Sequence, residues 1–238
     1  MGACHSAACG DAPSVTTIAD LKRSVLPIEC IHSSQRVRQV VNGNAGTAFF
    51  VNTDGYFVTA NHVIESVKAL ADKCDAAVLP PGTGQAHQTN PTGRPIYWFD
   101  TAACAQDPND DIAVCQTIED PFSDEALKGT ISPARFETRP HADGTEVAIT
   151  GFPSGYAWPV TARASIAASS EVNALPTITI DRSTWHGMSG APLFVANGGV
   201  IGIVLGGETG DNVGLCIARP ASIIVEFLRK HHIAFSVM

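Results

Sequence analysis

Short apolar runs, separated by turn-forming residues, recur along the chain from Val25 onward. They are rich in Val, Ile, Phe and Thr, which favour β-strands, and the segments between them contain Gly, Asn, Asp and Pro. Two such runs, at 46–51 and 56–59, flank the sequence Asn-Thr-Asp-Gly at 52–55, in which glycine can supply the positive φ of a tight hairpin turn. This pattern predicts an all-β protein built as a sandwich or a barrel.

The same texture predicts strands at 145–150 and 177–180. It also predicts a second hairpin, in which strands at 193–195 and 200–205 flank a turn at 196–199.

Two segments have helical periodicity instead. One covers about 62–72, and its apolar inner face would consist of Ile64, Val67, Ala69 and Leu70. The other begins at Pro220, a residue suited to the first position of a helix, and runs to about His231. Its apolar stripe consists of Ile223, Ile224, Phe227 and Leu228. We interpret that stripe as a face that docks on the protein's own core.

Composition narrows the class of protein. The chain has 238 residues, of which 45% are hydrophobic and 16% charged, with a net charge of −8. This is enough apolar material for one large domain or two fused lobes, and it excludes a disordered chain. An acidic chain with a pI near 5.4 also lacks the basic surface that binds nucleic acid. The longest strongly apolar run, at 199–206, is too short for a transmembrane segment, so we expect a soluble globular protein.

The cysteines and the N-terminus give weaker indications. The seven cysteines are an odd number, so at least one thiol is unpaired or pairs with another chain, and none has metal-ligand spacing, so no metal site is expected. Residues 1–16 are interpreted as a flexible tail. They fit the permissive pattern for N-myristoylation at Gly2, with Cys4 as a second acylation site, but we do not expect lipidation. No secretory signal is visible, which leaves the cytoplasm, or secretion with the signal removed, as alternatives.

Three segments each contribute one residue with catalytic chemistry. His62 stands where a predicted strand gives way to a helix, Asp111 heads the apolar run Ile-Ala-Val, and Ser189 lies within Gly-Met-Ser-Gly. Each has an ordinary explanation alone, since Asp and Gly are common turn formers. Together they supply a nucleophile, a base that takes its proton and an acid that orients the base. Glycine beside the serine also lets backbone N–H groups converge on an oxyanion.

The order of these residues separates two classes of serine hydrolase. His62, Asp111 and Ser189 follow one another at intervals of 49 and 78 residues, in the order of the chymotrypsin arrangement. An α/β-hydrolase would run Ser, Asp, His and would need glycine two residues after the nucleophile, where this chain has Ala191. The order and the motif both exclude that class.

On these residues the sequence resembles the chymotrypsin-fold, or trypsin-like, serine peptidases. It is most similar to the disulfide-independent bacterial type that includes the high-temperature-requirement proteases. The matching segments are 46–51, 58–63, 111–114, 151–153, 187–193 and 199–204. The resemblance implies two six-stranded antiparallel β-barrels with the active site between them. After the tail, the domain would cover 17–238, with a first barrel at about 25–118, a linker at about 119–142, a second barrel at about 143–218 and a C-terminal helix at about 220–231.

The resemblance also implies a role for each residue. Ser189 would be the nucleophile, His62 the general base and later the acid, and Asp111 the group that orients the imidazolium. The N–H groups of Gly187 and Ser189 would form the oxyanion hole. Asp110 is a rival for the acid, but Asp111 directly heads the apolar strand, where the family places its aspartate.

Three departures from the family pattern stand out. Digestive members carry an Asp before the catalytic serine, and this chain has Met188 there, so activation by a new N-terminus is not expected. No cysteine flanks His62 or Ser189, so the disulfides typical of those members are not expected. We expect no PDZ domain after His231.

The resemblance outlines the substrate pocket as well. Its residues would be Ser183, Trp185, His186, Leu205 and Gly206. Ser183 would form the floor of the S1 pocket and offers no charge to a Lys or Arg side chain, so a small or apolar P1 residue is expected. Leu205 and Gly206 would pair with substrate as an added strand. Glu208 and Asp211, in the next loop, are interpreted as solvated turn residues.

We therefore predict a serine endopeptidase that acts on polypeptides through an acyl-enzyme intermediate, without a metal or organic cofactor. Three alternatives are kept: a non-catalytic binding module on the same fold, a latent enzyme whose oxyanion loop must be ordered by a partner, and an esterase with the same triad. Paired peptide and ester substrates separate them, and an inert folded protein would indicate the binding module. The sequence does not determine the oligomeric state.

Overall fold

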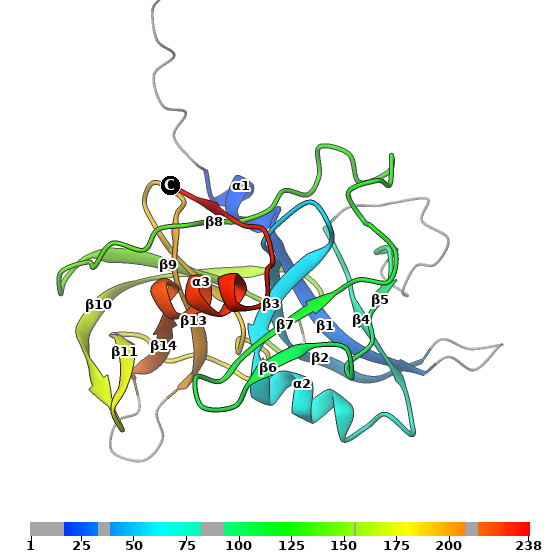
Figure 1. The fold of residues 1–238 in the computed structure, drawn as a ribbon, viewed down its shortest axis with the longest axis horizontal. Helices are drawn as coiled ribbons and strands as arrows, with labels where there is room; N and C mark the ends of the chain where they lie inside the picture. Colours follow the sequence, from blue (N-terminus) through cyan, green and yellow to red (C-terminus); the bar gives the residue numbers. More distant parts are fainter. Residues whose placement is uncertain (1–16, 33–38, 82–92, 155, 208–213) are drawn as a thin grey trace, which may run out of the picture.

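The structure, a computed structural model, describes residues 17–32, 39–81, 93–154, 156–207 and 214–238. Figure 1 shows two β-structures side by side, the first half of the chain (blue to green) next to the second half (green to red). The helices of the described ranges are short, and they are α1 (Ile18–Lys22), α2 (Asn61–Lys68) and α3 (Ala221–Lys230).

The first half is a curved antiparallel sheet. Its strands are β1 (Val25–His32), β2 (Gln39–Phe50), β3 (Tyr56–Ala60), β4 (Asp75–Val78), β5 (Tyr97–Trp98), β6 (Ala105–Asp107) and β7 (Ile112–Gln116). They lie in the order β5-β4-β1-β2-β3-β7-β6. Phe99, directly after β5, forms a bridge with Thr117, directly after β7. The sheet therefore curves until its two ends meet, with β6 added on the outside.

The second half contains a closed barrel. Its strands are β8 (Arg135–Phe136), β9 (Glu146–Gly151), β10 (Val160–Val172), β11 (Leu175–Ile180), β12 (Pro192–Val195), β13 (Val200–Gly207), β14 (Cys216–Pro220) and β15 (Ser236–Val237). Within the described residues six of them run in the order β12-β9-β10-β11-β14-β13, and β12 also pairs with β13, which closes the circle. β8 and β15 extend the sheet by parallel pairing. The predicted all-β class with a C-terminal helix is confirmed.

Both predicted hairpins are present. β2 and β3 are antiparallel neighbours on either side of the turn at 52–55, and β12 and β13 flank the turn at 196–199. The strands predicted at 145–150 and 177–180 are β9 and β11. The apolar pattern does not predict the longest strand, β10, because most of its residues are half-buried or exposed and many are Ala, Ser or charged residues.

The two helices differ in detail from the prediction. α2 ends at Lys68, and turns cover 69–73, because the chain turns there to enter β4. Ala69, predicted on the inner face, is exposed. Pro220 precedes α3 as its N-cap residue, with extended ψ, and does not begin the helix. The predicted apolar stripe of α3 is buried apart from the half-buried Ile223.

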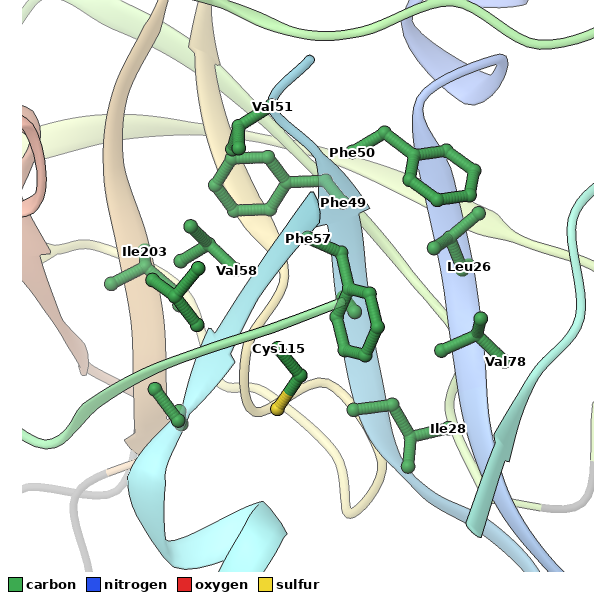
Figure 2. Packing of buried hydrophobic residues seen from close by; sticks show 14 of the residues in the cluster. Leu26, Ile28, Phe49, Phe50, Val51, Phe57, Val58, Val78, Cys115 and Ile203 are labelled. Carbon is green, nitrogen blue, oxygen red and sulfur yellow. The ribbon is translucent and has the colours of Figure 1, made fainter. Parts of the chain in front are cut away.

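One apolar core reaches from the first sheet into the second half. Figure 2 shows Phe49, Phe57 and Ile28 inside the first sheet, with Ile203 of β13 near Val58 of β3. The buried residues of α3 belong to the same cluster. The interior of the closed barrel forms a separate cluster. Because both sides of the interface share one close-packed core, packing fixes how the two halves face each other.

Two disulfides cross-link the first half. Cys30–Cys74 joins β1 to the residue before β4, and Cys104–Cys115 joins the residue before β6 to β7. The resemblance to a disulfide-independent type does not anticipate them, since strand pairing brings these cysteines together and their spacing in sequence does not show it. Cys216 is the buried free cysteine of the described residues.

Several sequence expectations fall outside the described residues. These are the tail at 1–16 with its acylation pattern at Gly2 and Cys4, and the loop acids Glu208 and Asp211. Among the helices that the structure describes, none combines the length and the apolar character needed to cross a lipid bilayer.

Candidate active site

His62 and Asp111 are brought together by neighbouring strands. His62 is the second residue of α2, which follows β3, and Asp111 directly precedes β7. β3 and β7 are antiparallel, and Ala60 lies opposite Ile112, so the end of one strand meets the start of the other. His62 Nδ1 lies 2.7 Å from Asp111 Oδ2, and the His62 backbone N–H donates to Asp111 Oδ1 at 2.9 Å. The carboxylate therefore holds both the ring and the first turn of the helix.

This contact sets the tautomer of the imidazole. A carboxylate only accepts hydrogen bonds, so the ring hydrogen is assigned to Nδ1, and Nε2 keeps its lone pair. The His62 side chain is 48% exposed and lines a cleft. An imidazole arranged in this way can accept a proton from a nucleophile.

Asp110, the rival acid, faces a different partner. Arg219 of β14 donates from Nε to the Asp110 carbonyl at 3.1 Å, and the same nitrogen lies 3.4 Å from Asp110 Oδ1. Burial raises the pKa of the Asp110 carboxyl, and the Arg219 guanidinium opposes that rise. Of the two adjacent acids, the structure therefore brings Asp111 to His62.

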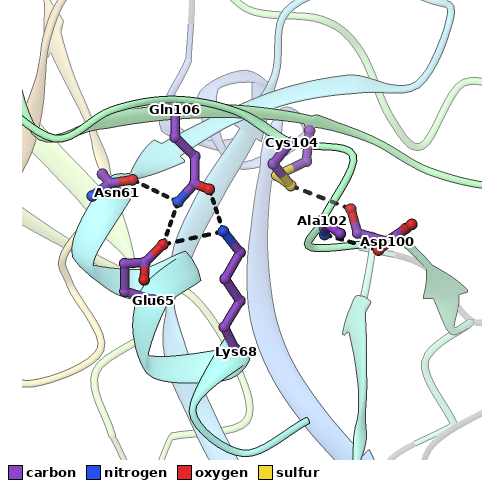
Figure 3. The surroundings of a disulfide bond; sticks show 8 residues. Asn61, Glu65, Lys68, Asp100, Ala102, Cys104 and Gln106 are labelled. Carbon is purple, nitrogen blue, oxygen red and sulfur yellow. Dashed lines mark hydrogen bonds and ion pairs between the residues drawn. A yellow bond between two sulfur atoms is a disulfide. The ribbon is translucent and has the colours of Figure 1, made fainter.

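A polar cluster ties the β6–β7 hairpin to α2 (Figure 3). The amide nitrogen of Gln106 in β6 donates to Asn61 and to Glu65 of α2, at 2.7 Å in each case. The amide oxygen of Gln106 accepts a hydrogen bond from Lys68 of the same helix. The disulfide Cys104–Cys115 closes the same hairpin. These ties hold the hairpin that carries the candidate acid against the helix that carries the candidate base.

Ser189 lies in the tight turn before β12. Gly190 follows it with φ 87°, and a Cβ there would lie 2.0 Å from Thr47 O, so only glycine fits. The Ser189 hydroxyl donates to the backbone carbonyl of Leu205 in β13 at 2.9 Å. Ser189 and His62 line the same cleft. The structure thus brings the three candidates together, while the serine hydroxyl is engaged by Leu205 and not by His62.

The loop before Ser189 presents two backbone donors. They are the N–H groups of Gly187 and Ser189. In the peptide bond before Gly187, the His186 carbonyl accepts the Ser154 N–H at 2.7 Å, and in the peptide bond before Ser189, the Met188 carbonyl accepts the Ala191 N–H at 3.0 Å. In a trans peptide the N–H points opposite to the carbonyl. The N–H groups of Gly187 and Ser189 therefore point away from these partners, and no acceptor among the described residues receives them. Two such donors side by side can bind an oxyanion.

Thr47 of β2, which sequence reasoning missed, supports this loop from the other half of the molecule. It is fully buried, its hydroxyl donates to Gly187 O at 2.6 Å and accepts from Phe152 N–H at 2.9 Å, and its N–H donates to Ser189 O at 2.8 Å. The Gly-Phe-Pro element at 151–153 packs directly against the loop, since a Cβ on Gly187 would lie 2.3 Å from Phe152 O. The sequence contains only one indication of this role, which is that Thr47 lies within the segment 46–51 that matches the family pattern.

Met188 fixes the loop before Ser189 to the interior of the closed barrel. It is 1% exposed and belongs to the apolar cluster inside the closed barrel. The residue before Ser189 is therefore held by apolar packing, a support that requires no ion pair with a new N-terminus.

The cleft past His62 and Ser189 has a volume of about 920 Å³. Its described lining residues are His62, Pro153, Ser154, Tyr156, Val160, Thr184, Trp185, His186, Ser189, Gly206 and Gly207. Trp185, His186 and Gly206 thus lie where the sequence placed them. Ser183 is exposed and Leu205 is buried, and in the described part of the chain neither lines the cleft.

Tyr156, an aromatic residue that the sequence analysis did not single out, also lines the cleft. Tyr156 packs edge-on against Trp158 with ring centroids 6.0 Å apart, and Trp158 is 62% exposed. Trp185 is 47% exposed. No lining residue in the described ranges is Asp, Glu, Lys or Arg. The aromatic run after the Gly-Phe-Pro element was the available signal.

This fold and this grouping of residues define a class of protein. Residues 46–203, more than half of the chain, match the trypsin-like peptidase domain. The chain therefore belongs to the family of trypsin-like peptidase domains.

Two curated bacterial proteins, both named probable periplasmic serine endoprotease DegP-like, are similar in sequence. The protein from Bartonella henselae is 29% identical over 205 residues, which cover 84% of this chain and 35% of the relative. The protein from Rhizobium meliloti is 27% identical over 183 residues, which cover 75% of this chain and 31% of the relative. This chain thus spans about a third of the length of the curated relatives it matches.

Solved structures of the Rv3671c protease from M. tuberculosis share the fold. The active form has a TM-score of 0.63 at 18% identity, over 99% of this chain and 97% of that chain. The inactive form has a TM-score of 0.61 at 20% identity, over 90% of this chain and 91% of that chain.

Proposed function

We propose that this chain is a serine endopeptidase in which Ser189, His62 and Asp111 form the catalytic triad, and that polypeptides are its substrates. Ser189 Oγ attacks the scissile carbonyl while His62 Nε2 takes its proton and then passes it to the leaving amine. Water then hydrolyses the acyl-enzyme, with His62 again taking and returning a proton. The observation that carries this proposal is the 2.7 Å contact between Asp111 Oδ2 and His62 Nδ1 beside the cleft that holds Ser189.

The N–H groups of Gly187 and Ser189 are the donors for the oxyanion. Their peptide planes are held by hydrogen bonds from Ser154 and Ala191, which exist without any substrate. This support favours an oxyanion hole that is formed in advance over a latent loop that a partner must order.

Substrate binding frees the serine. Leu205 O accepts the Ser189 hydroxyl, and Leu205 stands at an irregularity where the pairing of β13 with β14 passes from Val204 to Gly206. A substrate strand added along this edge can donate a backbone N–H to that carbonyl. The Ser189 hydroxyl then turns to His62 Nε2.

The cleft favours an apolar side chain beside the scissile bond. Pro153, Tyr156, Val160 and Trp185 supply apolar surface, and the described lining contains no carboxylate to pair with a Lys or Arg side chain. Such a side chain gains free energy by leaving water, whereas a charged one would lose hydration without a partner.

A fluorophosphonate probe, which reacts with an activated serine, tests the triad. We expect wild type to be labelled, and Ser189→Ala and His62→Ala to lose about 10⁴-fold or more in activity. Ser183→Ala is the matched control, because it removes an exposed serine six residues before Ser189 that does not line the cleft, and it should label like wild type. Paired apolar peptide and ester substrates then separate a peptidase from an esterase. A folded wild type that neither labels nor cleaves would contradict the proposal and point to a binding module.

A further inference from the structure

The backbone at Asp111 is held in an uncommon conformation. Its φ of 54° lies in the left-handed region that favours glycine, and residues keep such a conformation only when their surroundings determine it. The turn that leads to it begins at Asp107, whose Oδ1 accepts the N–H groups of Asn109 and Asp110 at 3.0 and 3.2 Å. It ends where Asp111 O accepts the N–H of Asn61 at 3.1 Å. The direction of the Asp111 carboxylate therefore depends on how this turn is held.

The middle of the turn is held from the other half of the molecule. Arg219 is 5% exposed and belongs to β14 of the closed barrel. Its Nη1 donates to Pro176 O at 2.6 Å and to Thr177 Oγ1 at 3.3 Å, both in β11 of its own barrel. Its Nε donates across the interface to Asp110 O at 3.1 Å, beside the Asp110 carboxylate. One guanidinium thus joins the second barrel to the residue before Asp111.

The charges around the turn explain why an arginine stands there. Burial is the main cause that raises the pKa of the Asp110 carboxyl, the Arg219 guanidinium opposes that rise, and Asp107 and Glu226 add to it. A buried cation is retained only where it is paired and hydrogen-bonded, and the planar fork of arginine can reach acceptors on two sides at once.

We propose that Arg219 is a positioning residue for the reaction: it holds the 107–111 turn so that the Asp111 carboxylate meets His62. This inference rests on the proposed triad. It explains the two adjacent acids, since Asp111 orients the base while Asp110 anchors the turn. It also couples the two halves, because the second barrel, which carries the nucleophile, sets the acid of the first.

Arg219→Met tests the proposal. Loss of the clamp lets Asp111 move, and a displacement of about 1 Å in a catalytic group can cost on the order of 100-fold. We therefore expect kcat to fall about 10- to 100-fold with KM nearly unchanged, since Arg219 does not line the cleft. The low-field NMR resonance of the His62 Nδ1 proton, which reports its hydrogen bond to Asp111, should weaken or disappear.

A matched control separates positioning from stability. Arg139→Met breaks another arginine–carboxylate pair, to the buried Glu137, away from the site, and should lower stability without changing kcat or the resonance. A folded Arg219→Met with wild-type kcat and resonance would overturn the proposal. If Arg219→Met does not fold, Arg219→Lys is the second test. A single ammonium group cannot replace the several donors of the guanidinium, so kcat should fall in this variant too. A wild-type kcat in Arg219→Lys would overturn the proposal.

Failure of the triad itself gives a different result. If wild type neither cleaves nor labels, the proposed function fails, while the NMR resonance still reports whether Arg219 positions Asp111.

Discussion

The two halves of the molecule stabilise their sides of the cleft in different ways. The first half is cross-linked by disulfides between its strands, whereas the second half is a barrel whose strands pair all the way round. The ends of the first sheet meet at the bridge between Phe99 and Thr117, and the disulfides Cys30–Cys74 and Cys104–Cys115 cross-link it. In the second half β12 pairs with both β9 and β13, and no disulfide joins the described residues there.

The difference follows from how edges are managed. In the described residues the first sheet closes only through the bridge between Phe99 and Thr117, so its end strands can fray, and cross-links limit the freedom of its unfolded chain. A closed barrel has no such edges. In the second half the tight constraint is the close approach of backbone segments in the loop that carries Ser189. Gly187 and Gly190 each have φ 87° and lie against backbone atoms. We therefore expect the first half to respond to the loss of cross-links and the second half to side chains added at these glycines.

The largest effect is expected at Gly187. In Gly187→Ala the new Cβ would lie 2.3 Å from Phe152 O, at a φ that L-residues rarely adopt, so the loop must shift and the proposed oxyanion donor is displaced. Loss of one such donor costs about 10²- to 10³-fold in kcat. Gly144→Ala is the control, because its φ is 82° but no atom lies within 4 Å. Peptide hydrolysis by both variants checks this, and equal kcat values would contradict it.

The two disulfides of the first half should contribute to stability according to the length of chain that each one closes. The pairs Cys30/Cys74 and Cys104/Cys115 are 44 and 11 residues apart, so replacing each pair by Ala should lower the free energy of unfolding by about 4 and about 3 kcal/mol. Activity should follow the opposite order, since Cys104–Cys115 closes the hairpin that carries Asp111. Denaturant titrations and kcat for both double variants test this. Unchanged stability in both would show that the ties are dispensable.

Thr47 joins the two halves, so its loss should be felt in both stability and rate. Thr47→Val keeps the shape but leaves the Phe152 N–H and the Gly187 carbonyl without their buried partner. Such a loss costs roughly 2–3 kcal/mol of stability. We expect kcat to fall as well, because Gly187 is a proposed donor for the oxyanion. Thr47→Ser restores the hydroxyl and should recover most of both, and a Ser variant as weak as the Val variant would argue for packing instead.

The smallest effect is a pH dependence far from the site. Hydrogen bonds from Arg139 lower the pKa of the buried Glu137 to about 2 from the usual 4.5. A lowered folded-state pKa means that this pair stabilises the protein above pH 4.5 and that the contribution is lost as the pH falls toward 2. The stability difference between wild type and Arg139→Met should therefore be present at pH 7 and shrink at pH 3. A constant difference would contradict this.

Local patterns were enough for part of the fold. The hairpin turn at 52–55 and the stripe of α3 were predicted because neighbouring residues alone encode a turn or a helix face. β10 was not, because a half-exposed strand of small and charged residues has no apolar signature. The disulfides were not, because pairing of distant strands brings the cysteines together.

For the site, the sequence alone was enough to predict the chemical groups: a histidine, an acid and a glycine-flanked serine, in a diagnostic order. The sequence preferred Asp111 over Asp110 through the family resemblance alone. The physical reason is visible only in the folded molecule, because adjacent residues in a turn point in different directions and their partners, His62 and Arg219, lie far away in sequence. The support from Thr47 was decided by the tertiary structure in the same way. Contacts between residues about a hundred positions apart depend on how the two halves pack, and no local pattern of residues records that packing.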